Sequence, residues 1–183
     1  MTSIHHLTTE QLEAGDGHAR ESPSDGGTVE MIVCRPGIDE RRVLEEGRLV
    51  VGDGLVGDNY LDRPAKGDDK PHPEAQLNLM NSRVVDLVAE GRRDRWSLAG
   101  DQFFVDFDLS ADNAPAGTRL SIGTAVIEVS TKPHNGCAKF AERFGIDAAR
   151  WVNADKAARR RGINAMVVQA GVVRAGDRIT KLD

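Results

Sequence analysis

The sequence has few cysteines, few aromatic residues and no long apolar run. Its two cysteines, Cys34 and Cys137, lie far apart in a chain with no export signal, so a disulfide framework is not expected. No window approaches the roughly 18 apolar residues that a membrane helix needs. Residues 1–27 also lack the basic and apolar stretches of a signal peptide. These absences predict a cytoplasmic protein without a membrane partner.

Basic residues are also fewer than acidic residues, and the formal net charge is −5. This argues against a nucleic-acid partner held by a general positive field. The charge is uneven, because residues 132–183 contain 11 basic and five acidic residues while residues 1–131 have an acidic excess of 11. A basic segment that contains a cysteine favours a compact anionic ligand, although a set of solvated helix faces would have the same pattern.

The length of 183 residues, with 39% hydrophobic residues, is enough for one core. The mean hydropathy of −0.41 is that of an ordinary globular protein. Residues 1–27 combine histidine, glycine, serine and acidic residues without an apolar period, and we expect a mobile N-terminal arm there. Residues 28–183 are expected to form a single domain.

Short strands dominate the predicted secondary structure. Apolar alternation predicts strands from Thr28 to Pro36, over Asp101–Ser110, in TRLSIG and AVIEVST, and in INAMVVQAGVVRAGDRI. The three central strands follow one another with tight turns, which indicates a meander. Asn81-Ser82 caps one predicted helix. The segment from His134 to Gly162 predicts two or three short helices with a break at Gly145.

Seven or eight short strands with a small helical insertion predict a mainly β, barrel-like fold mixed with a few short helices. Closure into a barrel removes the exposed edges that so many strands would otherwise present. Antiparallel pairing is expected.

A glycine-rich segment, GDGLVGD, has the spacing of a dinucleotide fingerprint at Gly52, Gly54 and Gly57. The residues that follow are acidic and end in Pro64, where the fingerprint requires a helix, so a dinucleotide site is excluded. Asp58 opens a polar loop and is a candidate site residue. A tight turn, in which the aspartate caps backbone amides, is the structural alternative.

Cys137 is the residue most suited to chemistry. It lies in KPHNGCAKF, after a strand and at the start of a predicted helix. The helix terminus and the neighbouring His134 and Lys139 favour the thiolate, which is both a nucleophile and a soft metal ligand. A structural cysteine would have apolar neighbours instead. His134 is a candidate proton source, or alternatively a solvent-exposed strand-end residue.

Five segments in order resemble the MOSC domain, a family named for the C-terminal domain of molybdenum cofactor sulfurases. They are Gly54-Leu55-Val56-Gly57-Asp58, Leu98-Ala99-Gly100-Asp101, Gly117-Thr118-Arg119-Leu120-Ser121-Ile122-Gly123, Pro133-His134-Asn135-Gly136-Cys137 and Gly171-Val172-Val173-Arg174-Ala175-Gly176-Asp177. The resemblance covers about residue 22 to the end. It implies a fold rich in β-barrel structure with a groove for molybdopterin.

The resemblance also implies a function. In family members such as the mitochondrial amidoxime reducing component and the bacterial YiiM proteins, a cysteine binds molybdenum and the protein reduces N-hydroxylated compounds. Cys137 matches that cysteine. The chain is therefore expected to be a molybdenum cofactor-dependent oxidoreductase that acts on a small-molecule substrate and receives electrons from a separate donor protein. Pyridoxal phosphate, which larger sulfurases use, is not expected, because neither Lys132 nor Lys139 is marked as desolvated enough for a Schiff base.

Molybdopterin carries a dithiolene and a phosphate, so a protein needs one soft ligand and nearby cations to hold it. Lys139, Arg143 and Arg161 are candidate phosphate ligands, and Asn164 is a candidate hydrogen-bond donor to the cofactor. Two alternatives remain open. Cys137 would carry a persulfide from a cysteine desulfurase in a sulfur carrier, and a noncatalytic barrel would bind an anionic ligand without using the thiol.

Overall fold

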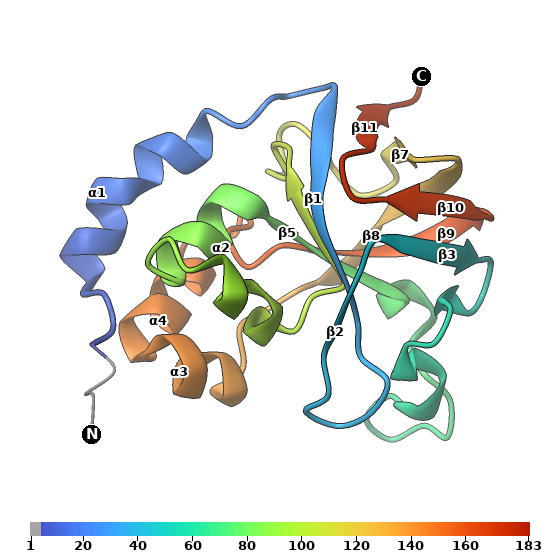
Figure 1. Cartoon of the computed structure of the whole chain (residues 1–183), viewed down its shortest axis with the longest axis horizontal. Helices are drawn as coiled ribbons and strands as arrows, with labels where there is room; N and C mark the ends of the chain where they lie inside the picture. The colour runs from blue at the N-terminus through green and yellow to red at the C-terminus, as the bar shows by residue number, and fades with distance from the viewer. Residues whose placement is uncertain (1–4) are drawn as a thin grey trace.

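Seven strands close into a mixed β-barrel, and four α-helices pack against one side of it (Figure 1). The computed structural model describes residues 5–183. Around the ring the order is β1, β11, β7, β8, β9, β5 and β6, and β6 pairs with β1 to close it. The ring consists of β1 (Gly27–Cys34), β5 (Leu77–Asn81), β6 (Phe103–Asp106), β7 (Arg119–Ile122), β8 (Ala125–Pro133), β9 (Ile163–Gln169) and β11 (Arg178–Lys181).

The other elements lie around this ring. Strand β2 (Arg42–Leu44) pairs antiparallel with the end of β1. A second sheet contains β10 (Gly171–Arg174), β3 (Glu46–Val50) and β4 (Gly54–Leu55). The α-helices are α1 (Thr9–Arg20), α2 (Ser82–Val88), α3 (Ala138–Phe144) and α4 (Ile146–Ala154). Three 3₁₀ helices, η1 (Asn59–Asp62), η2 (Pro73–Ala75) and η3 (Arg93–Ala99), complete the secondary structure. Among residues 5–183, no helix is long and apolar enough to cross a bilayer.

The apolar side chains form two separate clusters. One fills the barrel and includes Val29, Leu79 and Phe103. The other lies between the barrel wall and the helices and includes Met80, Phe104 and Trp151. Neighbouring residues of β5 and β6 therefore point into different clusters, as the alternation of side chains along a strand requires.

Strand β1 departs from simple alternation. Its pairing with β6 shifts register between Val29 and Met31, which is the mark of a β-bulge. As a result Val29 and Ile32 both face the barrel interior, while Met31 faces the helices. Simple alternation along this strand would place Val29 and Met31 on the same face, and the extra residue at the bulge explains the difference.

The predicted barrel-like fold is confirmed, and so is the helix that Asn81 caps. One expectation about pairing is wrong. Strands β6, β7 and β8 do not form a meander, because β6 pairs with β1 and β5 while β7 pairs with β8 and β11. The expected antiparallel pairing holds within residues 5–183 for every strand pair except β5 and β6, which run parallel with α2 in the connection between them.

Helix α1 occupies the segment that was expected to be a mobile arm. A capping box between Thr8 and Gln11 begins the helix. Leu12 is fully buried in the helical layer, where α1 packs on α2 and α4. Asp16 forms an ion pair with Arg160 at 2.9 Å. The expectation is therefore wrong for residues 9–20, because a single buried leucine and a distant arginine hold a helix that has no clear apolar period. The division of the chain into an arm and one domain stays a prediction.

A candidate site around Cys137 and the His134–Asp101–Arg161 cluster

Cys137 lies at the start of α3, in the connection that leaves β8. Its side chain is exposed, whereas Cys34 is buried in the barrel. The thiol makes no capping hydrogen bond to the helix. Cys137 is therefore open to a ligand or a substrate, and Cys34 is a core residue at the end of β1.

The segment before Cys137 is fixed from several sides. The Nδ2 group of Asn164, on β9, donates to the carbonyl oxygens of Lys132 and Pro133, both at 3.1 Å. The backbone N–H of Gly136 donates to Oδ1 of Asn153, on α4, at 2.8 Å. Contacts from a strand and a helix therefore hold the loop that presents the thiol, which is the kind of support that a precise binding site needs.

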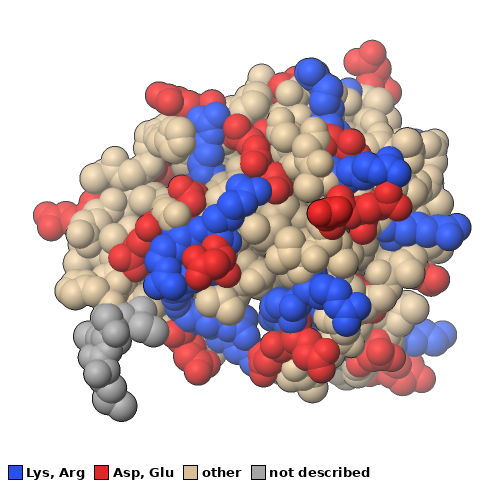
Figure 2. Space-filling model, viewed as in Figure 1, with Lys and Arg blue, Asp and Glu red and all other residues tan. Residues whose placement is uncertain are grey.

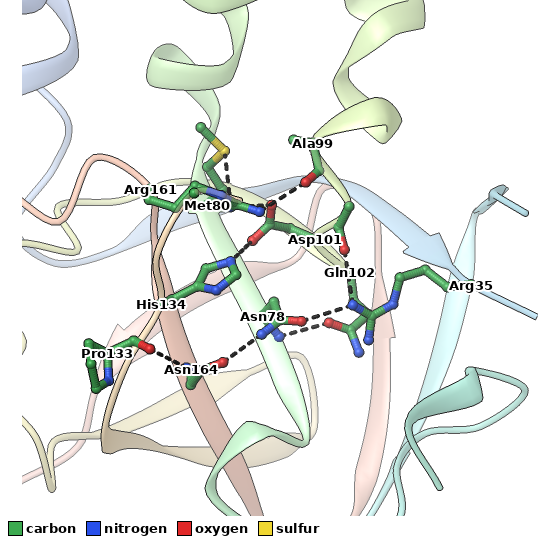
Figure 3. A network of polar contacts seen from close by, with 12 residues as sticks. Arg35, Asn78, Met80, Ala99, Asp101, Gln102, Pro133, His134, Arg161 and Asn164 are labelled. Atoms are coloured by element: carbon green, nitrogen blue, oxygen red, sulfur yellow. Dashed lines mark hydrogen bonds and ion pairs between the residues drawn. The ribbon is translucent and has the colours of Figure 1, made fainter. Parts of the chain in front are cut away.

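His134 is held in the same loop by a buried aspartate. Its Nε2 lies 2.9 Å from Oδ1 of Asp101, and Nη1 of Arg161 donates to Oδ2 of the same carboxylate at 2.6 Å (Figure 3). The second terminal nitrogen of Arg161 donates to the carbonyl of Ala99 at 2.9 Å. The Asp101 side chain has no exposed surface, and that of His134 is 15% exposed. Asp101, which lies just before β6, thus connects the loop that contains His134 with the turn that contains Arg161.

The charges of this cluster determine its protonation state. Burial raises the pKa of Asp101, but Arg161 and His134 together lower it by more. The pKa therefore lies below its usual value, and the carboxylate is ionised. Burial and Arg161 lower the pKa of His134 more than Asp101 raises it. His134 is therefore neutral at pH 7. Because an ionised carboxylate only accepts hydrogen bonds, the imidazole proton lies on Nε2, and Nδ1 is left as a free acceptor.

A second polar network supports the site from the barrel side. The guanidinium of Arg35, at the end of β1, binds both carboxylate oxygens of Asp58 at 2.9 Å. It also donates to Oδ1 of Asn78 at 2.9 Å, and Asn78 donates to Oδ1 of Asn164 at 2.6 Å (Figure 3). The network therefore runs from Arg35 to the residue that holds the loop before Cys137.

The structure gives Asp58 a framework role where the sequence analysis expected a cofactor ligand. Its side chain is fully buried, and it also accepts the backbone N–H of Tyr60 as the N-cap of η1. Both oxygens are occupied by protein donors. The contacts match the alternative of a turn aspartate that caps backbone amides, with a buried ion pair added.

The three predicted phosphate ligands are all paired with carboxylates. Lys139 and Arg143 both bind Oδ1 of Asp39, at 2.8 and 3.0 Å. Arg161 is only 6% exposed and binds Asp101. Figure 2 shows a similar pattern over the face in view, where many Lys and Arg side chains lie next to Asp and Glu. An anion would have to compete with these acidic partners.

Among residues 5–183, two arginines that the sequence analysis did not single out, Arg41 and Arg63, have no acidic partner. Within the part of the chain that the structure describes, neither Arg41 nor Arg63 forms an ion pair. Desolvation and the nearby guanidinium groups of Arg143 and Arg35 lower the pKa of Arg41. Desolvation and Arg35 lower the pKa of Arg63, and the charges of Asp58 and Cys137 oppose that shift. Arg63 therefore places a positive charge in the neighbourhood of the Cys137 thiol.

A cleft of about 290 Å³ lies beside the loop. His134, Arg161 and Asn164 line it together with Lys132, Lys156 and Arg159. Cys137, Lys139, Arg143 and Asp58 do not line it. The structure thus brings three of the predicted site residues to one cleft and leaves the other four outside it.

The described residues cannot enclose a metal ion by themselves, since no group of three or more His, Cys, Asp or Glu side chains has suitable geometry. A metal that brings its own ligands needs only one soft donor from the protein, and the exposed thiol of Cys137 meets that need. The donor set fits a metal that is carried by a cofactor.

The lowered pKa of His134 predicts how stability depends on pH. Below its ordinary pKa of 6.5, the unfolded chain binds a proton at this residue that the folded chain does not bind. Stability should therefore fall as the pH drops below 6.5, and the contribution of Asp101 should be lost only below its ordinary pKa of 3.8. Urea unfolding between pH 7 and 5 checks this. His134→Gln should flatten the slope, and His5→Gln, at an exposed position, should not; equal slopes in all three proteins would contradict the assignment.

A family model of the MOSC domain matches residues 67–180. The fold is similar to three crystal structures. One is described as a hypothetical protein (TM-score 0.62, 20% identity, 91% of this chain and 71% of that chain covered). The others are YuaD from Bacillus subtilis (0.61, 16%, 84% and 93%) and YiiM from Escherichia coli (0.57, 20%, 85% and 70%). No curated protein matches the sequence.

Proposed function

Because the chain belongs to the MOSC domain family, we propose that it binds the molybdenum cofactor through Cys137 and reduces N-hydroxylated small molecules. The observation that carries the proposal is an exposed thiol on a loop that is tied to β9, to α4 and to a buried Asp101–His134 pair. Such a loop holds the sulfur in one place while leaving it open to a bound group.

The residues around the thiol suit the two ends of the cofactor. Cys137 offers the soft ligand that the metal requires. Arg41 and Arg63, whose positive charges have no carboxylate partner in the described part of the chain, would hold the phosphate. This assignment replaces Lys139, Arg143 and Arg161, whose charges already bind Asp39 and Asp101.

When bound, the cofactor supplies the two electrons that break an N–O bond. The reduction of an N-hydroxylated amine consumes two electrons and two protons and releases the amine and one water molecule. The electrons come from a separate donor protein. The protons must reach the substrate through protein groups or water.

In this proposal His134 moves one of these protons. Its Nε2–H is held by Asp101, which leaves Nδ1 to accept a proton from water and to pass it on. Arg161 keeps Asp101 ionised and so keeps the imidazole in this orientation. Asp101 and Arg161 are positioning residues, because they act through His134.

The proposal is tested by the metal content of the wild-type protein. The chain is expressed in a host that makes the cofactor, purified under reducing conditions and analysed by mass spectrometry for molybdenum. We expect close to one molybdenum per chain. A protein that contains none, and that takes up none when the released cofactor is added, would refute the proposal.

A further inference from the structure

The cleft beside His134 has an excess of positive charge that the proposed function does not use. Lys132 and Lys156 are exposed on its rim, and neither forms an ion pair within residues 5–183. Arg159 donates to the carbonyl of Ala114 at 2.7 Å and also has no carboxylate partner there. Burial lowers the pKa of Arg159, so its positive charge is poorly solvated. Three cations thus line one cleft, and none of them forms an ion pair within residues 5–183.

The remaining charges in the cleft do not cancel this excess. Asp155 is the single acidic residue among those that line the cleft, and its Oδ1 accepts the backbone N–H groups of Ala157 and Ala158. The charge of Arg161 is paired with Asp101, but its Nε–H has no acceptor among the described residues and is open to a ligand. The neutral groups of Ser130 and Asn164 already donate to backbone carbonyls, so the cations are the groups open to a ligand. Several cations without carboxylate partners in one cleft are typical of a site for a compact oxyanion.

We propose that this cleft binds a phosphate or comparable dianionic group of the small-molecule substrate, beside His134, which lines the cleft and precedes Cys137 in the same loop. The inference rests on the proposed function for the identity of the reaction, but the anion site stands on the geometry of the cleft. The volume of about 290 Å³ suits a small group, since it is at the lower end of the range for small-molecule pockets. Because Cys137 does not line the cleft, the cofactor's metal is assigned to the neighbouring side of the loop.

The test measures inorganic phosphate binding to the molybdenum-free protein by NMR titration at constant ionic strength. Saturable shifts of amide signals are expected at residues that line the cleft. A Lys132→Gln, Lys156→Gln double variant should bind phosphate at least tenfold more weakly, because both charges are lost while the exposed positions tolerate glutamine. Arg174→Gln removes one charge from an exposed ion pair on β10 and serves as the control that keeps wild-type affinity.

A second measurement separates the substrate's anion from that of the cofactor. The molybdenum content of the double variant should equal that of the wild type when both are produced in the same host. A parallel loss of molybdenum would overturn the proposal, because the cleft would then hold the phosphate of the cofactor. Absence of saturable shifts in the wild type, or equal affinity in the double variant, would also overturn it. If the wild type contained no molybdenum, the proposed function would fail while the phosphate titration still decided the anion site.

Discussion

Asp101→Ala is expected to lower the free energy of unfolding by about 3–5 kcal/mol, the usual cost of removing one partner from a buried ion pair. The variant would leave the guanidinium of Arg161 buried without a counter-ion, since that side chain is only 6% exposed. It would also remove the acceptor that holds His134. Urea unfolding at pH 7, followed by tryptophan fluorescence, measures the loss.

Two further variants identify the cause of that loss. Asp177 also follows a glycine, but it lies at a surface turn, and within residues 5–183 its side chain accepts one hydrogen bond, from the backbone N–H of Arg174 at 2.7 Å. Asp177→Ala should therefore cost about 1 kcal/mol, the worth of one hydrogen bond. Replacing both charges, with Asp101→Leu and Arg161→Met, should recover part of the stability because no buried charge is left unpaired. Similar losses for Asp101→Ala and Asp177→Ala would show that Asp101 is no more than a turn residue.

The parts of the fold that local sequence controls could be predicted. Asn81 caps α2 by accepting the backbone N–H groups of Arg83 and Val84, so the signal lies within three residues. The break at Gly145 requires a φ of 92°, which glycine adopts without strain. Strand alternation in residues 103–107 matches the two clusters on either side of β6. A count of short strands was then enough to indicate a barrel.

The pairing of strands could not be predicted in the same way. Strand β6 lies between β1 and β5. Strand β1 is far from β6 in the sequence, and α2 and η3 separate β5 from β6. The next strand in the sequence, β7, is not a neighbour of β6 in the ring. Alternation shows which side of a strand is apolar, but it does not show which strand is its neighbour. The position of α1 also depends on a distant residue, because Asp16 binds Arg160.

The same limit applies to the candidate site: residues that are close in the sequence could be identified, and residues that only folding brings together could not. Cys137 and His134 could be found because they share one short segment whose composition is unusual. Their supporting residues could not be ranked, since Asp101 looks like any other aspartate after a glycine. Lys139 and Arg143 were expected to be available to an anion, but they bind Asp39, a residue about 100 positions away. Free charge in a folded protein is a property of three-dimensional pairing, and sequence gives only the number of charges.

Cys137→Ser is expected to reduce bound molybdenum to the level of a cofactor-free control. Serine replaces the soft sulfur donor with a hard oxygen of similar size, so the metal loses its protein ligand while the loop keeps its shape. The metal-free variant should unfold at the same temperature as the metal-free wild type, because the Cys137 side chain is exposed and caps no helix amide. Metal content by mass spectrometry and thermal unfolding of both apoproteins make the comparison.

Cys34→Ala is the matched control, because Cys34 is the other free cysteine and is buried at the end of β1. It should cost some stability through the small cavity it leaves, yet retain molybdenum. Equal molybdenum in Cys137→Ser and the wild type would show that the thiol is not the ligand. The sulfur-carrier alternative predicts a different result: label from cysteine and a cysteine desulfurase would load the wild type and Cys34→Ala but not Cys137→Ser, in protein that holds no molybdenum. The same thiol thus separates the two functions, because a metal ligand is detected by the metal it retains and a carrier by the sulfur it receives.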